Sequence, residues 1–175
     1  MAGRLQRELK QHRGFPSSAV EASLSIQRTA DLLHRRLCQV LRPEDLSPAQ
    51  YNVLRILRGA ARARPDAPGL PCREIAARLL TWDPDVTRLT DRLVARGLAL
   101  RDRLRGDRRV VLVAITSLGQ EVLARLDAPV AACDAGGLDS LGEARLRTLI
   151  DTLDAIRDQL DPEPAASTTS LPETP

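Results

Sequence analysis

The stretch LPCREIAARLLTWDPDVTRLTDRLVARGLALR, residues Leu70–Arg101, contains two short amphipathic segments separated by a proline-containing turn. Apolar residues at helical spacing predict a helix of about two turns over Arg73–Leu80. A second helix is predicted over Pro84–Arg96, with Asp83 as its N-cap and Gly97 just after its end. Two short helices joined by a tight turn are typical of a helix-turn-helix.

The second predicted helix has two chemically different faces. The inner face is formed by Val86, Leu89, Thr90, Leu93 and Val94. The outer face carries Asp85, Arg88, Asp91, Arg92 and Arg96, with Thr87 at its border. An arginine on such a helix can read guanine through two hydrogen bonds, and Thr87 can contact a phosphate or a thymine methyl group. The alternative is a solvated helix face. Asp85 and Asp91 would repel phosphate unless they pair with Arg88 or Arg92, or accept a hydrogen bond from cytosine.

Arg73, near the start of the preceding helix, is a further candidate phosphate contact, because free backbone amides at a helix start favour anions. The chain after this motif then alternates. It predicts strands over residues 98–104 and 110–115 with a turn at Gly106–Asp107, and places Leu98, Leu100 and Leu104 on one face, with Arg101 and Arg103 on the other.

The tip of this hairpin is strongly basic. Arg105, Arg108 and Arg109 cannot neutralise one another on a narrow turn, so they require an anion or solvent. A DNA minor groove concentrates negative potential and accepts such a wing, and Asp107 could brace Arg109 there. A solvated turn that keeps the hairpin edge from aggregating is the alternative. The preceding helix-turn-helix favours the DNA interpretation and gives the outline of a winged helix.

Helices are also predicted on both sides of this region. Ser18 and Glu21 have the spacing of a capping box, Ser47–Pro48 begins a helix that ends at Gly59, and Thr116 begins another. A further capping box is predicted at Ser140 and Glu143. The helix after it has a heptad seam, which predicts a surface for a partner helix, although packing within the chain is the ordinary alternative. The seam comprises Leu146, Leu149, Leu153, Ile156 and Leu160.

Composition limits the class of protein. The chain has 175 residues, of which 43% are hydrophobic and only 2% aromatic, which favours packed helices. Residues 1–115 contain 22 basic and 12 acidic side chains, whereas residues 116–175 contain 4 and 11. This asymmetry suits a lobe that meets a polyanion and a lobe that meets protein. Arginine makes up 25 of the 26 basic residues, so a general preference for surface arginine is the alternative.

Several functions are disfavoured. The three cysteines, Cys38, Cys72 and Cys133, lack metal or disulfide spacing and indicate a cytoplasmic protein. The sequence shows no apolar run that would span a membrane and no signal region. His12 and His34 have no partners placed to form a catalytic triad, and no phosphate-binding loop or zinc-protease motif occurs. We therefore expect no enzyme activity, no metal and no cofactor.

Three segments resemble the MarR-type transcriptional regulators: LSPAQYNVLRIL, then the opening stretch, then RGDRRVVLVAITSLG. The last is similar to the wing signature of that family, in Asp107, Arg109, Thr116 and Gly119. The resemblance covers about residues 20–160. It implies a mostly α (α+β) fold, a winged helix-turn-helix with a two-stranded wing, and a homodimer in which the first helix and the last two helices of each chain interlock.

The resemblance further implies a regulator, more often a repressor, that binds a pseudo-palindromic operator in double-stranded DNA. Arg109 would enter the minor groove and the helix over Pro84–Arg96 would read the major groove. Members of the family commonly respond to small lipophilic ligands or to cysteine oxidation. Oxidant-sensing members carry the reactive cysteine near the start of the first long helix, whereas Cys38 lies near its end.

The expected organisation has five parts: a basic tail (1–17), an N-terminal dimerisation helix (18–45), the winged helix-turn-helix (46–116), C-terminal dimerisation helices (117–160) and a disordered tail (161–175). Two other functions remain open. One is a winged-helix module that serves protein assembly without specific DNA binding. The other is a redox sensor that uses Cys38, Cys72 or Cys133.

Overall fold

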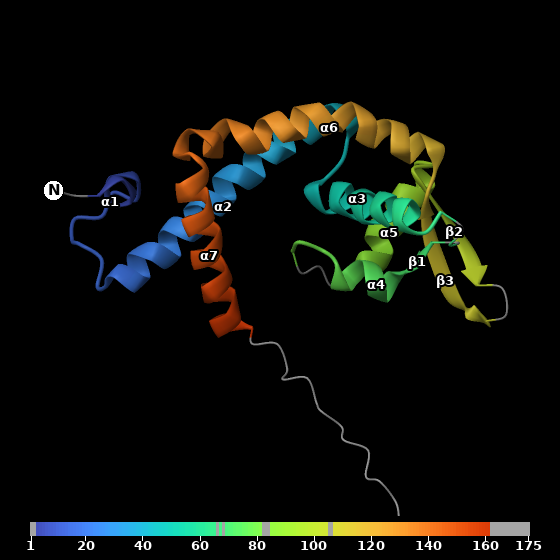
Figure 1. Cartoon of the computed structure of the whole chain (residues 1–175), viewed down its shortest axis with the longest axis horizontal. Coiled ribbons are helices and arrows are strands. Elements are labelled where there is room, and N and C mark those ends of the chain that lie inside the picture. The colour runs from blue at the N-terminus through green and yellow to red at the C-terminus, as the bar shows by residue number, and fades with distance from the viewer. Residues whose placement is uncertain (1–2, 66, 68, 82–84, 105–106, 162–175) are drawn as a thin grey trace, which may run out of the picture. The chain divides into compact units, whose positions relative to one another are not determined.

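A computed structural model describes residues 3–65, 67, 69–81, 85–104 and 107–161, with only the backbone described for residue 104 and residues 107–110. The chain forms two compact units, Met1–Asp134 and Ala135–Pro175. It is mostly helical, with one small sheet (Figure 1). In chain order the elements are α1 (Arg4–Glu8), α2 (Ser18–Leu41), the 3-10 helix η1 (Arg42–Glu44), α3 (Pro48–Ala63), β1 (Leu70–Pro71), α4 (Cys72–Ala77), α5 (Val86–Ala95), β2 (Ala99–Leu104), β3 (Asp107–Ile115), α6 (Ser117–Leu138), the 3-10 helix η2 (Asp139–Leu141) and α7 (Glu143–Leu160).

The helix starts were predicted with mixed success. Ser47 and Gln50 form a complete capping box at α3, with Pro48 at the first helical position, as the sequence indicated. At α2 the N-cap is Ser17, whose hydroxyl accepts from the Val20 amide at 3.3 Å, so the predicted Ser18 box was wrong by one residue. Adjacent serines offer equivalent hydroxyls, and the sequence pattern does not choose between them.

The predicted capping box at Ser140 and Glu143 does not form. Ser140 lies within η2, and α7 begins after Gly142, which has a positive φ of 74° and no capping side chain. α3 also continues to Ala63 beyond the predicted end at Gly59, because Ala60 and Ala61 pack against the core and favour helix. α4 covers Cys72–Ala77 and is shorter than predicted. The predicted N-terminal tail contains the short helix α1.

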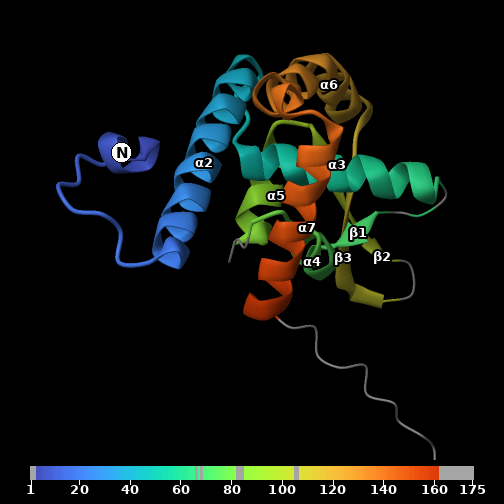
Figure 2. The ribbon, with the colours of Figure 1, turned by 60° about the vertical axis from the view of Figure 1, so that its left-hand side comes forward.

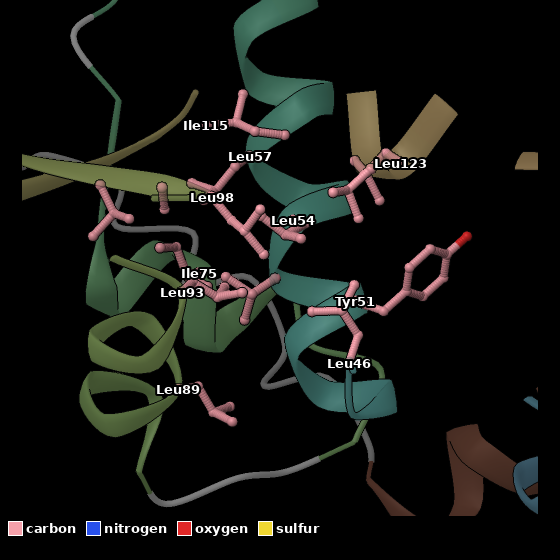
Figure 3. Packing of buried hydrophobic residues seen from close by; sticks show 14 of the residues in the cluster. Leu46, Tyr51, Leu54, Leu57, Ile75, Leu89, Leu93, Leu98, Ile115 and Leu123 are labelled. Atoms are coloured by element: carbon pink, nitrogen blue, oxygen red, sulfur yellow. The ribbon is translucent and has the colours of Figure 1, made fainter. Parts of the chain in front are cut away.

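The core of the first unit is built around α3. Its inner face buries Tyr51, Val53, Leu54 and Leu57, each at most 5% exposed. In Figure 3 the labelled side chains of α3 meet those from α4, α5, the sheet and α6, including Ile75, Leu93, Leu98, Ile115 and Leu123. Figure 2 shows α4, α5 and the β2–β3 hairpin on the same side of α3. Aliphatic packing on one central helix therefore fixes the positions of α4 and α5.

The sheet has three antiparallel strands in the order β1-β3-β2. Leu70 of β1 pairs with Val113 and Pro71 pairs with Leu112, so a two-residue strand precedes the helix-turn-helix. Leu104 pairs with Asp107, so Asp107 lies in β3 and not in the predicted Gly106–Asp107 turn. Gly106 lies outside the described residues.

Leu100 and Arg101 lie on opposite faces of β2 as predicted, whereas Leu98 does not share the face of Leu100. Leu100 is 45% exposed, whereas Ala99 is buried and Arg101 is half-buried. The register explains the difference. Ala99 pairs with Ile115 and Arg101 with Val113, and both β3 residues face the core. Leu98 is buried but precedes the first residue of β2. Its burial therefore does not indicate which residues of β2 face the core.

The threonine and glycine of the wing signature join the sheet to α6. Thr116 donates its hydroxyl to the Gly97 carbonyl at 2.7 Å and accepts from the Gly119 amide at 3.1 Å, which caps the helix as predicted. A Cβ atom at residue 119 would lie 2.2 Å from the Leu98 carbonyl oxygen. Only glycine fits, so this motif fixes where α6 meets the end of the helix-turn-helix.

Replacing this glycine is expected to destabilise the fold. Gly119→Ala should lower the free energy of unfolding by about 3 kcal/mol, because the methyl group meets backbone and not a movable side chain. Urea unfolding followed by circular dichroism measures the change. Gly59→Ala is the control, since no atom lies within 4 Å of its added Cβ and alanine favours the helix. Equal effects in the two variants would contradict the close approach at Gly119.

A second link joins α3 to α6. Arg58 donates two hydrogen bonds to the Asp127 carboxylate, at 2.8 and 2.7 Å, and the Arg58 side chain is 14% exposed. These hydrogen bonds from Arg58 hold the pKa of Asp127 below its usual value of 3.8. The carboxylate therefore stabilises the folded chain when ionised and loses this contribution as the pH falls through 3.8 and below.

Asp127→Asn should consequently make the free energy of unfolding less dependent on pH in the acid range. Near neutral pH the variant is expected to be less stable by about 1 kcal/mol, and at about pH 3 the difference from the parent should shrink. Urea unfolding at both pH values measures this difference. Asp134→Asn, which neutralises an exposed carboxylate on the same helix, is the control. A difference that stays constant with pH would contradict the ion pair as the cause.

Candidate nucleic-acid interface

The helix α5 packs its apolar face against the core and exposes its polar face. Val86, Leu89, Thr90 and Leu93 are buried and Val94 is half-buried, as the apolar pattern predicted. Thr87, Arg88 and Arg92 are exposed. Within the part of the chain that the structure describes, no hydrogen bond or ion pair holds the guanidinium groups of Arg88 and Arg92. These three side chains are therefore available to a ligand on the outer face.

The ends of α5 are fixed by local backbone chemistry. The Asp85 carboxylate accepts from the Arg88 amide at 2.9 Å, so Asp85 is the N-cap of a helix that begins at Val86. The prediction of Asp83 as N-cap and Pro84 as first residue was wrong, and both lie outside the described residues. Gly97 follows the helix with a φ of 69°, which favours glycine, as predicted. Asp85 thus has a structural role as an N-cap. The sequence analysis had considered it only as a DNA contact.

Arg101 is the residue that sequence reasoning missed. Its guanidinium reaches from β2 to α5, where it donates to the Asp91 carboxylate, to the Thr90 hydroxyl at 2.6 Å and to the Thr87 carbonyl at 3.1 Å. The sequence left open whether Asp91 pairs with Arg88 or Arg92, and in the structure its partner is Arg101. Arg101 thus neutralises a carboxylate on the same helix as Arg88 and Arg92.

Thr90 provided the signal that could have revealed this arrangement. It is a polar residue within an apolar stripe and is 0% exposed. Its hydroxyl donates to the Thr87 carbonyl at 2.8 Å and accepts from Arg101. A buried hydroxyl requires such partners, so a threonine at this position indicates a nearby polar side chain.

The remaining candidate contacts are partly described. Arg73 is exposed in the first turn of α4, where the prediction placed it. The Leu80 amide after α4 donates to the Asn52 side chain at 2.8 Å, which anchors the turn to α3. The backbone of Asp107, Arg108 and Arg109 lies in β3. Pro84 and Arg105 lie outside the described residues, and the Asp107 brace of Arg109 stays a prediction.

Two helices carry apolar side chains that the chain does not bury. On α2, Val20, Ile26, Leu32 and Leu33 are 37–42% exposed, and only Leu41 is buried. In the second unit α7 contains no buried residue. Of its predicted seam, Leu149 and Leu160 are exposed and Leu146, Leu153 and Ile156 are half-buried. Both helices therefore have apolar surface available for a partner.

Other kinds of site find little support. Among the described residues, no three histidine, cysteine or acidic side chains are grouped to hold a metal ion. The thiols of Cys38, Cys72 and Cys133 are free and half-buried. None of the helices in the described part of the chain has the length and apolar character to cross a bilayer.

A helix-turn-helix followed by a β-hairpin, with exposed arginines on the second helix of the motif, defines a winged helix-turn-helix. No family model matches the chain. A MarR transcription factor from Planctomyces limnophilus is 39% identical in sequence, with a TM-score of 0.60 over 81% of this chain and 99% of that structure. The chain belongs to the MarR family. It is a DNA-binding transcriptional regulator and not an enzyme.

Two further relatives agree. The HTH-type transcriptional regulator TtmR of Methylorubrum extorquens strain PA1 is 29% identical over 151 residues, which cover 85% of this chain and 70% of that protein. CouR of Rhodococcus jostii RHA1, solved with p-coumaroyl-CoA, is 26% identical, with a TM-score of 0.65 over 81% of this chain and 95% of that one. The repressor CouR has also been solved on a 23-mer DNA duplex. That structure is 27% identical to this chain, with a TM-score of 0.68, and the match covers 82% of this chain and 98% of that one.

Proposed function

We propose that the protein is a homodimeric repressor that binds an inverted-repeat operator and leaves it when a small molecule binds. The observation that carries the proposal is α5, which exposes Thr87, Arg88 and Arg92 while Arg101 neutralises Asp91 beside them. A helix with this composition can enter a major groove, because arginine donates two hydrogen bonds to guanine and the adjacent carboxylate no longer repels phosphate.

The proposal of a homodimer is supported by the uncovered apolar side chains of α2 and α7. A second copy of the chain would bury them through a self-complementary surface, as two-fold symmetric oligomers do. Two copies of α5 would then read two half-sites, and the operator would be an inverted repeat. The seam of Leu146, Leu149, Leu153, Ile156 and Leu160 is the part of α7 proposed to lie in this interface.

Repression and ligand response are proposed by analogy with the relatives. CouR is a repressor and has been solved both on DNA and with p-coumaroyl-CoA. A ligand releases a repressor only if it binds the free form more tightly than the DNA-bound form. The proposal therefore requires that the bound ligand lower the affinity for DNA and that bound DNA lower the affinity for the ligand by the same factor.

Arg109 and its neighbours Arg105 and Arg108 are proposed to follow the phosphate backbone into the minor groove, with Asp107 as their brace. Such contacts are independent of sequence and sensitive to salt. Arg73 at the start of α4, together with Pro84 and Asp85, is proposed to position the motif on phosphate. Base selection is assigned to Thr87, Arg88 and Arg92.

The test is to incubate the purified protein with sheared genomic DNA at two salt concentrations and to sequence what is retained, with Arg109→Ala in parallel. We expect a narrow set of fragments that share an inverted repeat, with weaker retention at high salt and in the variant. When these fragments serve as templates in a transcription assay, the protein should reduce the amount of transcript. Uniform or absent retention by the parent protein would contradict the proposal and would favour a role in protein assembly.

A further inference from the structure

The corner between α2 and α3 is held in an unusual backbone conformation. α2 ends at Leu41, η1 follows, and Asp45 has a φ of 48° and a ψ of 45°. This left-handed region is unfavourable for most residues other than glycine, although aspartate adopts it more readily than most. Leu41 and Leu46 on either side are 0% and 6% exposed, so the core anchors both ends of the corner. A corner that is anchored in this way can hold the helices that contact it in fixed positions.

α5 contacts this corner through Arg96, the residue that directly follows the helix. Arg96 is the C-cap of α5, and its guanidinium donates to the Glu44 carbonyl at 2.7 Å and also to the Asp45 carbonyl. The Asp45 carboxylate lies 4.0 Å away and is almost fully exposed, so the two carbonyl bonds are the main contact. Arg96 is thus occupied at the corner, unlike Arg88 and Arg92 on the same helix.

The same corner is tied to α6. Arg125 donates from Nε to Glu44 Oε1 at 2.7 Å and from Nη2 to Glu44 Oε2 at 3.0 Å. The Glu44 side chain is 21% exposed, and the hydrogen bonds from Arg125 lower its pKa, so the carboxylate is ionised at neutral pH. Glu44 therefore binds α5 through its backbone carbonyl and α6 through its carboxylate.

We infer that Arg96 is a positioning residue for DNA binding, which sets the direction of α5 by holding its C-terminal end to this corner, while Glu44 and Arg125 hold that corner to α6. The inference rests on the proposed role of α5 as the reading helix. Arg101 ties the first half of α5 to β2, and Arg96 ties its C-terminal end to the corner, so the helix has little freedom to tilt. Release of the C-terminal end would let α5 move relative to the groove and would misplace Arg88 and Arg92.

Direct contact between Arg96 and a phosphate is the competing explanation, and salt dependence separates the two. A phosphate contact contributes about one unit to the slope of log affinity against log salt, whereas a positioning contact contributes none. The two explanations also differ for Arg96→Lys, which keeps the charge but cannot reproduce the fork of two hydrogen bonds.

The experiment measures the affinity of parent and variants for a duplex that carries the recovered inverted repeat, at several salt concentrations. We expect Arg96→Ala and Arg96→Lys each to weaken binding about tenfold without changing the salt slope. Glu44→Gln keeps the carbonyl that binds Arg96 but weakens the bonds to Arg125, so it should cost about threefold, like Arg125→Ala. The double variant Arg96→Ala, Arg125→Ala should lose less than the product of the single effects, because both act through Glu44.

Other outcomes overturn the inference. Full binding by Arg96→Lys, or a salt slope reduced by about one in Arg96→Ala, would show that Arg96 acts by its charge. Independent effects of Arg96 and Arg125 would show that Glu44 does not connect them. Loss of binding in Arg88→Ala, with none in Arg96→Ala, would overturn the positioning role but leave the reading helix intact. Full binding by both variants would instead contradict the proposed function.

Discussion

Leu153→Asp is expected to convert the proposed homodimer into a monomer and to abolish operator binding at low protein concentration. Leu153 is the central residue of the α7 seam and is half-buried in the chain. In a symmetric interface the substitution would place two carboxylates in apolar surroundings without partners. The dimer dissociation constant should rise on the order of 1000-fold, and a monomer would keep only the contacts of one half-site.

Sedimentation velocity and a binding titration on the same preparation measure both effects. Ala155→Asp adds the same charge two residues along α7, on a different face of the helix, and is expected to change neither property. The circular dichroism of the whole chain should be nearly unchanged in both variants, which shows that they are folded. A Leu153→Asp protein that remains dimeric would show that the seam packs elsewhere, and the proposed interface on α7 would have to be abandoned.

Arg101→Ala is expected to weaken operator binding about 100-fold and to lower the free energy of unfolding by about 2 kcal/mol. The variant removes the only described partner of the Asp91 carboxylate and one partner of the buried Thr90 hydroxyl. Asp91 would then repel phosphate beside Arg88 and Arg92, and α5 would lose its attachment to β2. Urea unfolding and a fluorescence titration with the operator duplex measure the two quantities.

Two further variants separate position from charge. Arg103→Ala removes the same charge two residues along β2 from an exposed side chain and should have a much smaller effect. The double variant Asp91→Ala, Arg101→Ala removes the repelling carboxylate and should recover part of the lost affinity. If Arg101→Ala and Arg103→Ala weaken binding equally, general loss of positive charge is the better explanation.

The sequence predicted the elements that follow from periodicity and from turn residues. The inner face of α5, the cap at Ser47 and the cap at Thr116 were confirmed because each depends on residues close together in the chain. The glycine after α5 was confirmed for the same reason. Local chemistry therefore sufficed to predict the winged helix-turn-helix, and the family membership agrees.

The residues that sequence reasoning missed depend on tertiary register. The alternation of β2 did not show that the face of Arg101 is the inner one, which follows from its pairing with the buried Val113. The sequence left the partner of Asp91 open, and that partner is ten residues away on a strand. Arg96 and Arg125 reach Glu44 across 52 and 81 residues. Contacts at such separations leave no periodic signal in the sequence.

The central claim is that the outer face of α5 selects the base sequence of the operator. The most direct measurement selects binding sites from a random DNA pool with the parent protein, with Arg88→Ala and with Arg145→Ala, which removes an exposed charge from α7. We predict that Arg88→Ala loses the preference for one guanine in each half-site and binds the parent operator less tightly by about 1 to 3 kcal/mol, while Arg145→Ala selects the parent sequence. An unchanged selected sequence for Arg88→Ala, with affinity equal to that of the parent, would contradict the claim.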